Sequence, residues 1–349
     1  MKANRNLPLD QFIELALYDK VNGYYMKKNP FGKKGDFITA PNITRLFSEI
    51  IAIWVVTFWK SIGSPKTFNL LEFGSGNGEM MKVIIETLKN FPECFLNCNF
   101  QIHEKSELLK KKQQLSLKSE KITWIKDIKI NNSFPTIFLA NEFFDALPIK
   151  QFFKKKEVWF ERFVDLKAEK KAEFKEEPVD IKDIEHDVNF EISKNQEIIE
   201  YSPGSFEYLK HICNLIKKND GGILIIDYGY LQFKMHETLQ AVKNHKHTNI
   251  LEDIGDSDIT YNINFNLFKT FVDQFGDLNS MICNQKKFLT SMGIVQRAEI
   301  ISENIPFTKK SDLFYRIRRL IDEKQMGELF KVMLIKKKKN KFKTGFEID

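Results

Sequence analysis

The chain has 349 residues, more than a single hydrophobic core usually organises, so we expect one full α/β domain with a large insertion or second lobe. Hydrophobic residues make up 42% of the chain and charged residues 29%, a balance that excludes intrinsic disorder. The net charge of +7 comes mostly from lysine, but the basic runs 154–156 and 336–339 lack the interleaved aromatic and glycine pattern of an RNA-binding surface. We therefore expect no nucleic-acid partner.

The cysteines and the first residues indicate the compartment. Cys94 and Cys98 form a lone C-x-x-x-C without nearby histidines, which predicts free thiols rather than a zinc site. Residues 1–11 have neither the apolar core of a signal peptide nor an amphipathic presequence. No stretch reaches the ~20 apolar residues of a membrane span. The sequence predicts a soluble, intracellular protein.

The first predicted elements are helical. Residues 11–17 form a short amphipathic stretch, and a loop region punctuated by glycine and proline follows. After Pro41, apolar residues spaced i, i+3, i+4, i+7 predict one helix that continues to Phe58 and buries a wide face.

From residue 68, short apolar segments alternate with amphipathic ones. The expected strands are 68–73, 100–103, 122–125, 136–140 and 222–226, with helices over 79–89 and 106–118. This alternation predicts a Rossmann-like, doubly wound α/β sheet. The expected organisation is an N-terminal helical segment with a lid loop (1–62), the core (63–149 and 201–335) with an excursion at 228–265, a β-rich insertion (150–200) and a basic tail (336–349). The excursion contains His236, His245 and His247, but no carboxylate–histidine helix motif accompanies them, so no metal site is predicted.

The first strand of the core runs into a glycine loop. No Lys-Ser or Lys-Thr follows, which excludes a Walker loop, and the G-x-G-x-G spacing differs from the G-x-G-x-x-G of dinucleotide-binding proteins. The E-x-G-x-G-x-G pattern of Glu72, Gly74, Gly76 and Gly78 looks like motif I of class I S-adenosylmethionine methyltransferases. That ligand carries no phosphate, so an acid beside the loop suits it. An ordinary glycine-rich turn remains the alternative.

Further acids follow the next strands. Ligands of doubly wound folds bind at the carboxyl ends of the strands. Glu104 is placed to accept hydrogen bonds from both ribose hydroxyls, and Asp127 could accept one from the adenine amino group. Either acid alone could instead be a helix cap or a surface charge.

The fourth strand ends in the sequence from Asn141 to Pro148, in which two carboxylates and an amide flank two phenylalanines. Methyl transfer from a sulfonium needs an oriented nucleophile and a proton acceptor. We expect Glu142 and Asp145 to be catalytic and to hold a guanidinium through paired hydrogen bonds, while Asn141 contacts the cofactor. The alternative is a helix N-terminus at which acids are stabilised by the dipole.

Several separated blocks together resemble the MidA-like methyltransferases, also called the mitochondrial complex I assembly factor 7 family. The resemblance covers nearly the whole chain, and Ser75 and Asn77 depart from it, since the family typically has Pro and Arg there. It rests on the sequences around 17–25, 35–41, 70–78, 140–148, 226–229, 245–246, 258–265, 285–289 and 326–331. It implies a class I methyltransferase with S-adenosyl-L-methionine as donor and S-adenosyl-L-homocysteine as product. The implied activity is symmetric dimethylation of arginine in a core subunit of respiratory complex I during assembly.

The block that begins at Gly35 has glycine freedom at one end and a helix start at the other. We expect Gly35, Asp36, Phe37 and Thr39 to form a lid or substrate wall over the donor. A cavity shared with residues 141–145 would favour an enzyme over a non-catalytic assembly chaperone that binds the donor. A narrow closed pocket would instead favour a small-molecule methyltransferase. We expect the protein in a bacterial cytoplasm, or in the mitochondrial matrix if its source is eukaryotic. The oligomeric state stays open.

Overall fold

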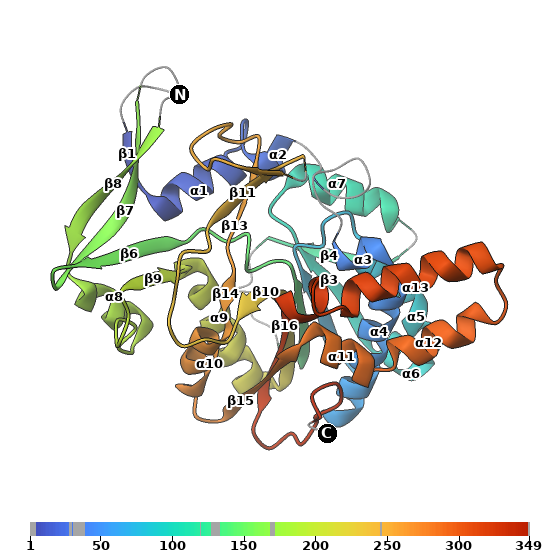
Figure 1. Cartoon of the computed structure of the whole chain (residues 1–349). Helices are drawn as coiled ribbons and strands as arrows, with labels where there is room; N and C mark the ends of the chain where they lie inside the picture. Colours follow the sequence, from blue (N-terminus) through green and yellow to red (C-terminus); the bar gives the residue numbers. More distant parts are fainter. Residues whose placement is uncertain are drawn as a thin grey trace.

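The computed structural model describes residues 5–27, 30, 39–118, 120–126, 133–167, 172–244 and 246–347. At its centre lies a sheet with the strand order β15-β16-β10-β5-β2-β3-β4, and β14 pairs with β10 (Figure 1). The strands are β2 (Phe68–Phe73), β3 (Cys98–His103), β4 (Ile122–Ile125), β5 (Thr136–Asn141), β10 (Gly221–Tyr230), β14 (Ile263–Asn264), β15 (Leu278–Asn284) and β16 (Phe330–Lys337). The five from β10 to β4 are parallel, and β16 is antiparallel to both of its neighbours. The prediction of a doubly wound, Rossmann-like sheet is confirmed.

Helices cover both faces of this sheet, because successive side chains of a strand point to opposite sides. In β2, Leu70 packs into one core and Leu71 into the other. The helices of the first core are α3 (Ala40–Ile43), α4 (Arg45–Ser61), α5 (Glu79–Leu88), α6 (Pro92–Leu96), α11 (Gln285–Ser291), α12 (Ile294–Ser302), α13 (Phe307–Ile321) and α14 (Met326–Leu329). Those of the second include α9 (Pro203–Asn219) and α10 (Phe265–Asp273), and α7 (Glu107–Ser116) follows β3.

The single helix expected from Pro41 to Phe58 is wrong, because the chain breaks at Thr44. This residue is extended, with φ −153° and ψ 139°, and its side-chain oxygen accepts a hydrogen bond from the N–H of Leu46. A threonine that caps the next helix competes with continuation of the previous one. The apolar spacing continues across the break, so periodicity alone could not reveal it.

A second lobe is built from two distant parts of the chain. Strand β1 (Arg5–Pro8) pairs antiparallel with β7, and β6, β8 and β9 complete this five-stranded sheet at the left of Figure 1. The insertion consists of β6 (Lys150–Lys155), β7 (Val158–Leu166), β8 (Ala172–Val179), α8 (Ile181–Val188) and β9 (Ile198–Tyr201). The N-terminal segment adds α1 (Leu9–Tyr18) and α2 (Tyr24–Lys27), and the 228–265 excursion holds the small sheet of β11 (Gln240–Lys243), β12 (Lys246–Thr248) and β13 (Asp258–Thr260).

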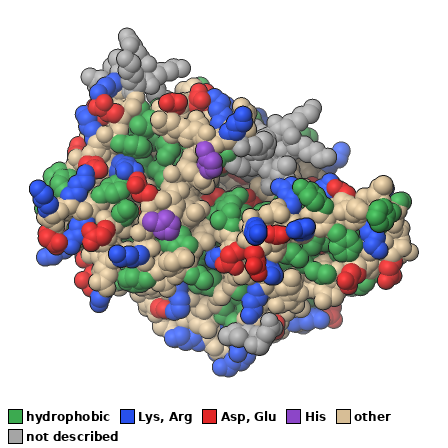
Figure 2. All heavy atoms as spheres, in the orientation of Figure 1, with side chains coloured by type: hydrophobic (Ala, Val, Ile, Leu, Met, Phe, Trp, Pro, Cys, Tyr) green, Lys and Arg blue, Asp and Glu red, His purple; other side chains and the backbone are tan. Residues whose placement is uncertain are grey.

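The segment expected to be a basic tail begins inside the sheet. Lys336 and Lys337 end β16, and Lys336 is only 3% exposed. Beyond the strand, Phe346 is buried against Phe288, with ring centroids 5.5 Å apart. On the face in Figure 2, Lys and Arg side chains are interspersed with Asp and Glu. Within the described ranges, no helix combines the length and the apolar character needed to cross a bilayer.

Candidate active site

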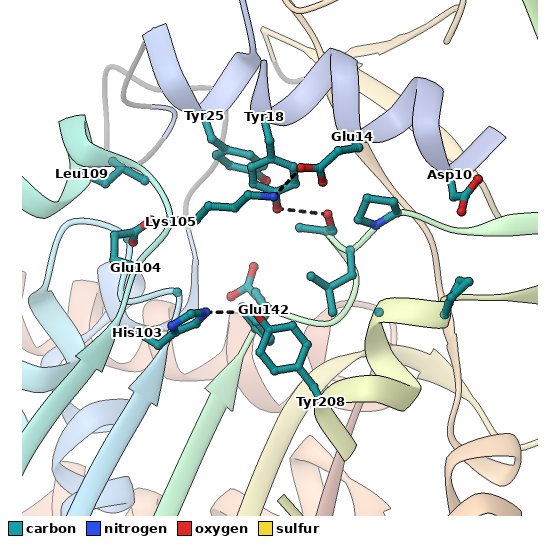
Figure 3. Close-up of a pocket in the computed structure, with 18 of the residues that line it drawn as sticks. Asp10, Glu14, Tyr18, Tyr25, His103, Glu104, Lys105, Leu109, Glu142 and Tyr208 are labelled. Carbon is teal, nitrogen blue, oxygen red and sulfur yellow. Dashed lines mark hydrogen bonds and ion pairs between the residues drawn. The ribbon is translucent and has the colours of Figure 1, made fainter. Parts of the chain in front are cut away.

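The carboxyl ends of β2, β3 and β5 open into a cavity of about 460 Å³, here called the main cavity (Figure 3). Helix α1 lies over it, and Tyr208 of α9 lies on the opposite side. A second cavity of about 30 Å³, the small cavity, shares Gly74, Gly76 and Glu142 with the first. The sheet edge predicted to bind a ligand is therefore hollow on both sides of the glycine loop.

The three glycines of the loop have backbone conformations that other residues rarely adopt. Their φ angles are 60° at Gly74, 53° at Gly76 and 82° at Gly78. A Cβ added to Gly74 would lie 3.0 Å from Cδ2 of Phe143. Gly74 and Gly76 line both cavities, whereas Gly78 precedes α5. The backbone therefore runs along the cavity wall without side chains in the way.

Glu72 lies at the end of β2 and lines the small cavity. The Ser75 hydroxyl donates a hydrogen bond to its Oε2 at 2.7 Å. Burial raises the pKa of Glu72 to about 7, although the bond from Ser75 opposes the shift. Ser75 thus gives the buried acid a hydrogen-bond donor.

Glu104 lines the main cavity and is held from two sides. Its Oε1 accepts the N–H of Ser106 at 2.9 Å, and its Oε2 accepts Nε2 of Gln113 at 2.8 Å. Burial raises the pKa of its carboxyl group. The same Nε2 donates to the carbonyl of Gly76 at 3.0 Å, and Oε1 of Gln113 accepts from the Trp124 indole at 3.0 Å. The fully buried Gln113, which our sequence analysis missed, thus joins the acid to the glycine loop.

Glu142 lies between the two cavities and lines both. It follows β5 with a φ of 50°, and its Oε1 accepts the N–H of Ala40 at 3.3 Å and Nδ2 of Asn141 at 3.2 Å. Burial raises the pKa of Glu142 to about 7. Asn141 lines the small cavity, and its Oδ1 is buried without a hydrogen-bond partner. An acceptor in this state fits the amino group of an amino-acid ligand.

Of the two acids predicted to be catalytic, Glu142 lines the cavities and Asp145 does not. Asp145 is buried, and it is not among the described residues that line either cavity. Oδ2 of Asp227 accepts the N–H groups of Phe143, Phe144 and Asp145 at 3.2, 3.0 and 3.3 Å, which fixes the turn after Glu142. Burial raises the pKa of Asp227 to about 8, and burial together with Asp227 raises the pKa of Asp145 well above its usual range. Asp227 thus positions the turn, a role that the sequence did not indicate.

The expected lid is described only at its end. Thr39 is buried and lines the small cavity with Asn141 and Glu142, so this end shares a cavity with the expected catalytic segment. Gly35, Asp36 and Phe37 lie outside the described residues, as do Asp127 and His245.

The wall opposite the core comes from the N-terminal segment and was also missed. Asp10, Glu14 and Tyr18 line the main cavity from α1, and their spacing of four residues places them on one helix face. The Tyr18 hydroxyl donates to the carbonyl of Ala146 at 3.2 Å, and Lys105 Nζ lies 2.5 Å from Glu14. The i, i+4 spacing of these polar residues is the feature of the sequence that could have predicted a polar helix face over the cavity. Across the described part of the chain, no three His, Cys, Asp or Glu side chains are grouped as metal ligands.

This chain is similar to known proteins over nearly its whole length. Protein arginine methyltransferase NDUFAF7 of Xenopus laevis is 25% identical over 372 residues, covering 99% of this chain and 85% of the relative. The Homo sapiens protein of that name is 27% identical, covering 95% and 80%. A crystal structure of a Burkholderia thailandensis protein bound to S-adenosyl-homocysteine has a TM-score of 0.80 at 22% identity, covering 98% of this chain and 89% of that one.

The family assignment rests on residues 50–282, which match the family described as "Putative S-adenosyl-L-methionine-dependent methyltransferase". The match covers most of the central sheet and every residue of the glycine loop. The chain therefore belongs to this family of S-adenosyl-L-methionine-dependent methyltransferases.

Proposed function

We propose that this protein transfers methyl groups from S-adenosyl-L-methionine to arginine side chains of a protein substrate. The observation that carries the proposal is the position of Glu142, a half-buried acid that lines both the small and the main cavity. The relatives named protein arginine methyltransferase NDUFAF7, mitochondrial, support the choice of arginine.

The finer parts of the proposal rest on the family resemblance. They are symmetric dimethylation, a core subunit of respiratory complex I as substrate, and action during its assembly. The proposed location is the cytoplasm in a bacterium and the mitochondrial matrix in a eukaryote.

The residues around the two cavities fit the donor. The Gly74 and Gly76 backbone admits a close ligand, Glu104 would accept from the ribose hydroxyls, and Oδ1 of Asn141 would accept from the amino group. When bound, S-adenosyl-L-methionine supplies an electrophilic methyl group. A contact of Asp127 with adenine and closure of the lid stay predictions.

The charge of the main cavity fits a cationic substrate. Four carboxylates line it, from Asp10, Glu14, Glu104 and Glu142, and Lys105 is its one lysine among the described residues. Arginine is protonated at neutral pH, so its nitrogen must be oriented and its charge balanced before it attacks. Glu142 can accept two hydrogen bonds from a guanidinium, and among the described acids it alone lines both cavities.

The test compares wild-type protein with Glu142→Gln on arginine-containing peptides and on purified complex I subunits. The amide keeps size and most hydrogen bonds, so calorimetry should show donor affinity within about threefold, while mass spectrometry should show methylarginine formation lower by at least ~10²-fold. Glu157→Gln is the control, because Glu157 is 88% exposed in a β-turn and should retain full activity. Donor binding without transfer by the wild type would instead identify a non-catalytic chaperone.

A further inference from the structure

Two residues that line the main cavity, His103 and Tyr208, form a hydrogen-bonded pair and are not among the residues proposed to contact the donor. Nε2 of His103 lies 2.9 Å from the Tyr208 hydroxyl, and Nδ1 lies 3.3 Å from the carbonyl of Ile125 (Figure 3). A carbonyl oxygen only accepts, so Nδ1 carries the ring proton in the neutral imidazole. Nε2 then accepts from the hydroxyl of Tyr208. The pair is thus set up to move a proton from Tyr208 toward His103.

The surroundings hold this pair in place. Tyr208 lies in the second turn of α9, and its ring packs edge-on against Phe73 at 5.7 Å and Phe143 at 5.2 Å. His103 ends β3 and is 7% exposed. Both side chains line the main cavity together with Glu142.

The chemistry of the proposed reaction requires such a group. Arginine remains a cation after methylation, so one proton must leave the attacking nitrogen as it gains the methyl group. A carboxylate that holds the guanidinium is most useful if it keeps its negative charge. Glu142 is therefore better suited to binding than to taking up the proton.

We propose that Tyr208 and His103 relay the proton that arginine loses during methyl transfer, an inference that rests on the proposed function. As the new N–C bond forms and the S–C bond of the donor breaks, the nitrogen proton passes to Oη of Tyr208. The hydroxyl proton of Tyr208 passes at the same time to Nε2 of His103. The imidazolium keeps its hydrogen bond to Ile125 and returns its proton to water after product release. Tyr208 is the catalytic residue, and His103 acts through it.

The charged groups that face His103 favour its protonation during the reaction. Among the described residues that line the main cavity with His103, these are Glu104, the next residue in the chain, and Glu142 after β5. Lys105 opposes them, but it is paired with Glu14. Carboxylates near an imidazole stabilise its cationic form.

The experiment uses the full chain with Tyr208→Phe, His103→Gln and the double variant. Tyr208→Phe keeps the ring packing and removes only the hydroxyl. We expect donor affinity by calorimetry to be unchanged, kcat on an arginine peptide to fall at least ~10-fold in each single variant, and the double variant to be no slower. On the acid side of the pH optimum, log kcat of the wild type should rise with pH with a steeper slope than that of Tyr208→Phe, because only the wild type needs both Glu142 and His103 without their protons.

Tyr261→Phe is the matched control, because this buried hydroxyl lies 3.4 Å from Ser205 of the same helix and outside the lining of both cavities. It should leave kcat and the slope unchanged. Nitrogen NMR of labelled histidine gives a second measurement, in which His103 should carry its proton on Nδ1 at pH 8. The opposite tautomer, or wild-type kcat and slope in Tyr208→Phe, would overturn the relay and leave the arginine assignment intact. Failure of the wild type to methylate arginine would overturn the proposed function and the relay with it.

Discussion

Replacement of Gln113 by methionine tests whether the donor site depends on one buried amide. Methionine has a similar length and is apolar, so Gln113→Met removes three hydrogen bonds without leaving a large cavity. The Trp124 N–H loses its acceptor, and Glu104 loses one of the two donors described for its carboxylate. Each buried group left without a partner costs about 1–3 kcal/mol, so the free energy of unfolding should fall by about 2–4 kcal/mol.

The effect on donor binding follows from the same contacts. Gln113 ties the acid expected at the ribose to the carbonyl of Gly76, so its loss frees both sides of the binding site. A hydrogen bond to a charged group contributes about 1.5–3 kcal/mol, and 1.4 kcal/mol corresponds to a tenfold change in Kd. Calorimetry should therefore show S-adenosyl-L-methionine bound at least ~10-fold more weakly.

The control is Gln285→Met. Gln285 is equally buried, and its amide donates to the carbonyl of Leu320 at 2.9 Å, in α13. Its replacement should lower Tm and leave the Kd for the donor unchanged. Donor affinity within twofold of wild type in a folded Gln113→Met protein would refute the reasoning.

Three further predictions concern the same site. Gly74→Ala places a Cβ 3.0 Å from Phe143 and should weaken donor binding, whereas Gly276→Ala, with a similar φ of 57° and open space around it, should cost only about 1–2 kcal/mol of stability. Burial raises the pKa of Glu142 from 4.5 to about 7. The contribution of Glu142 to the free energy of unfolding is therefore present below pH 4.5 and is lost as the pH rises through 7. The Tm of the wild type minus that of Glu142→Gln should be larger at pH 5 than at pH 8. Asp145→Asn should reduce methyl transfer less than Glu142→Gln in the same peptide assay, and an equal loss would return Asp145 to the substrate site.

The strands of the core could be predicted because they are short and mostly apolar. The expected segments 68–73 and 122–125 coincide with β2 and β4, and 222–226 lies inside the longer β10. The glycine loop could be predicted because the spacing of its glycines reflects positive φ angles, which are a local requirement of the backbone. Properties set by neighbouring residues are therefore readable from the sequence.

The parts of the site that escaped prediction depend on contacts between distant residues. Asp227 and the turn after Glu142 are more than 80 residues apart, and His103 and Tyr208 are 105 apart. Asp227 fixes the turn that carries Asp145 and so determines whether Asp145 lines the cavity. No local sequence pattern predicts this contact. The sequence suggested one role for both Glu142 and Asp145, whereas in the fold Glu142 lines both cavities and Asp145 is buried outside their lining.

The position of β16 has a consequence for synthesis of the protein. This strand, near the end of the chain, lies between β10 and β15, with Leu334 opposite Leu224 on one side and Met281 on the other. A nascent chain that has not yet released residues 330–337 from the ribosome exposes two unpaired strand edges in its interior, which favours aggregation and engagement by chaperones. The central sheet can therefore close only after residues 330–337 have left the ribosome. A stop codon before residue 330 would remove an interior strand and should abolish folding altogether.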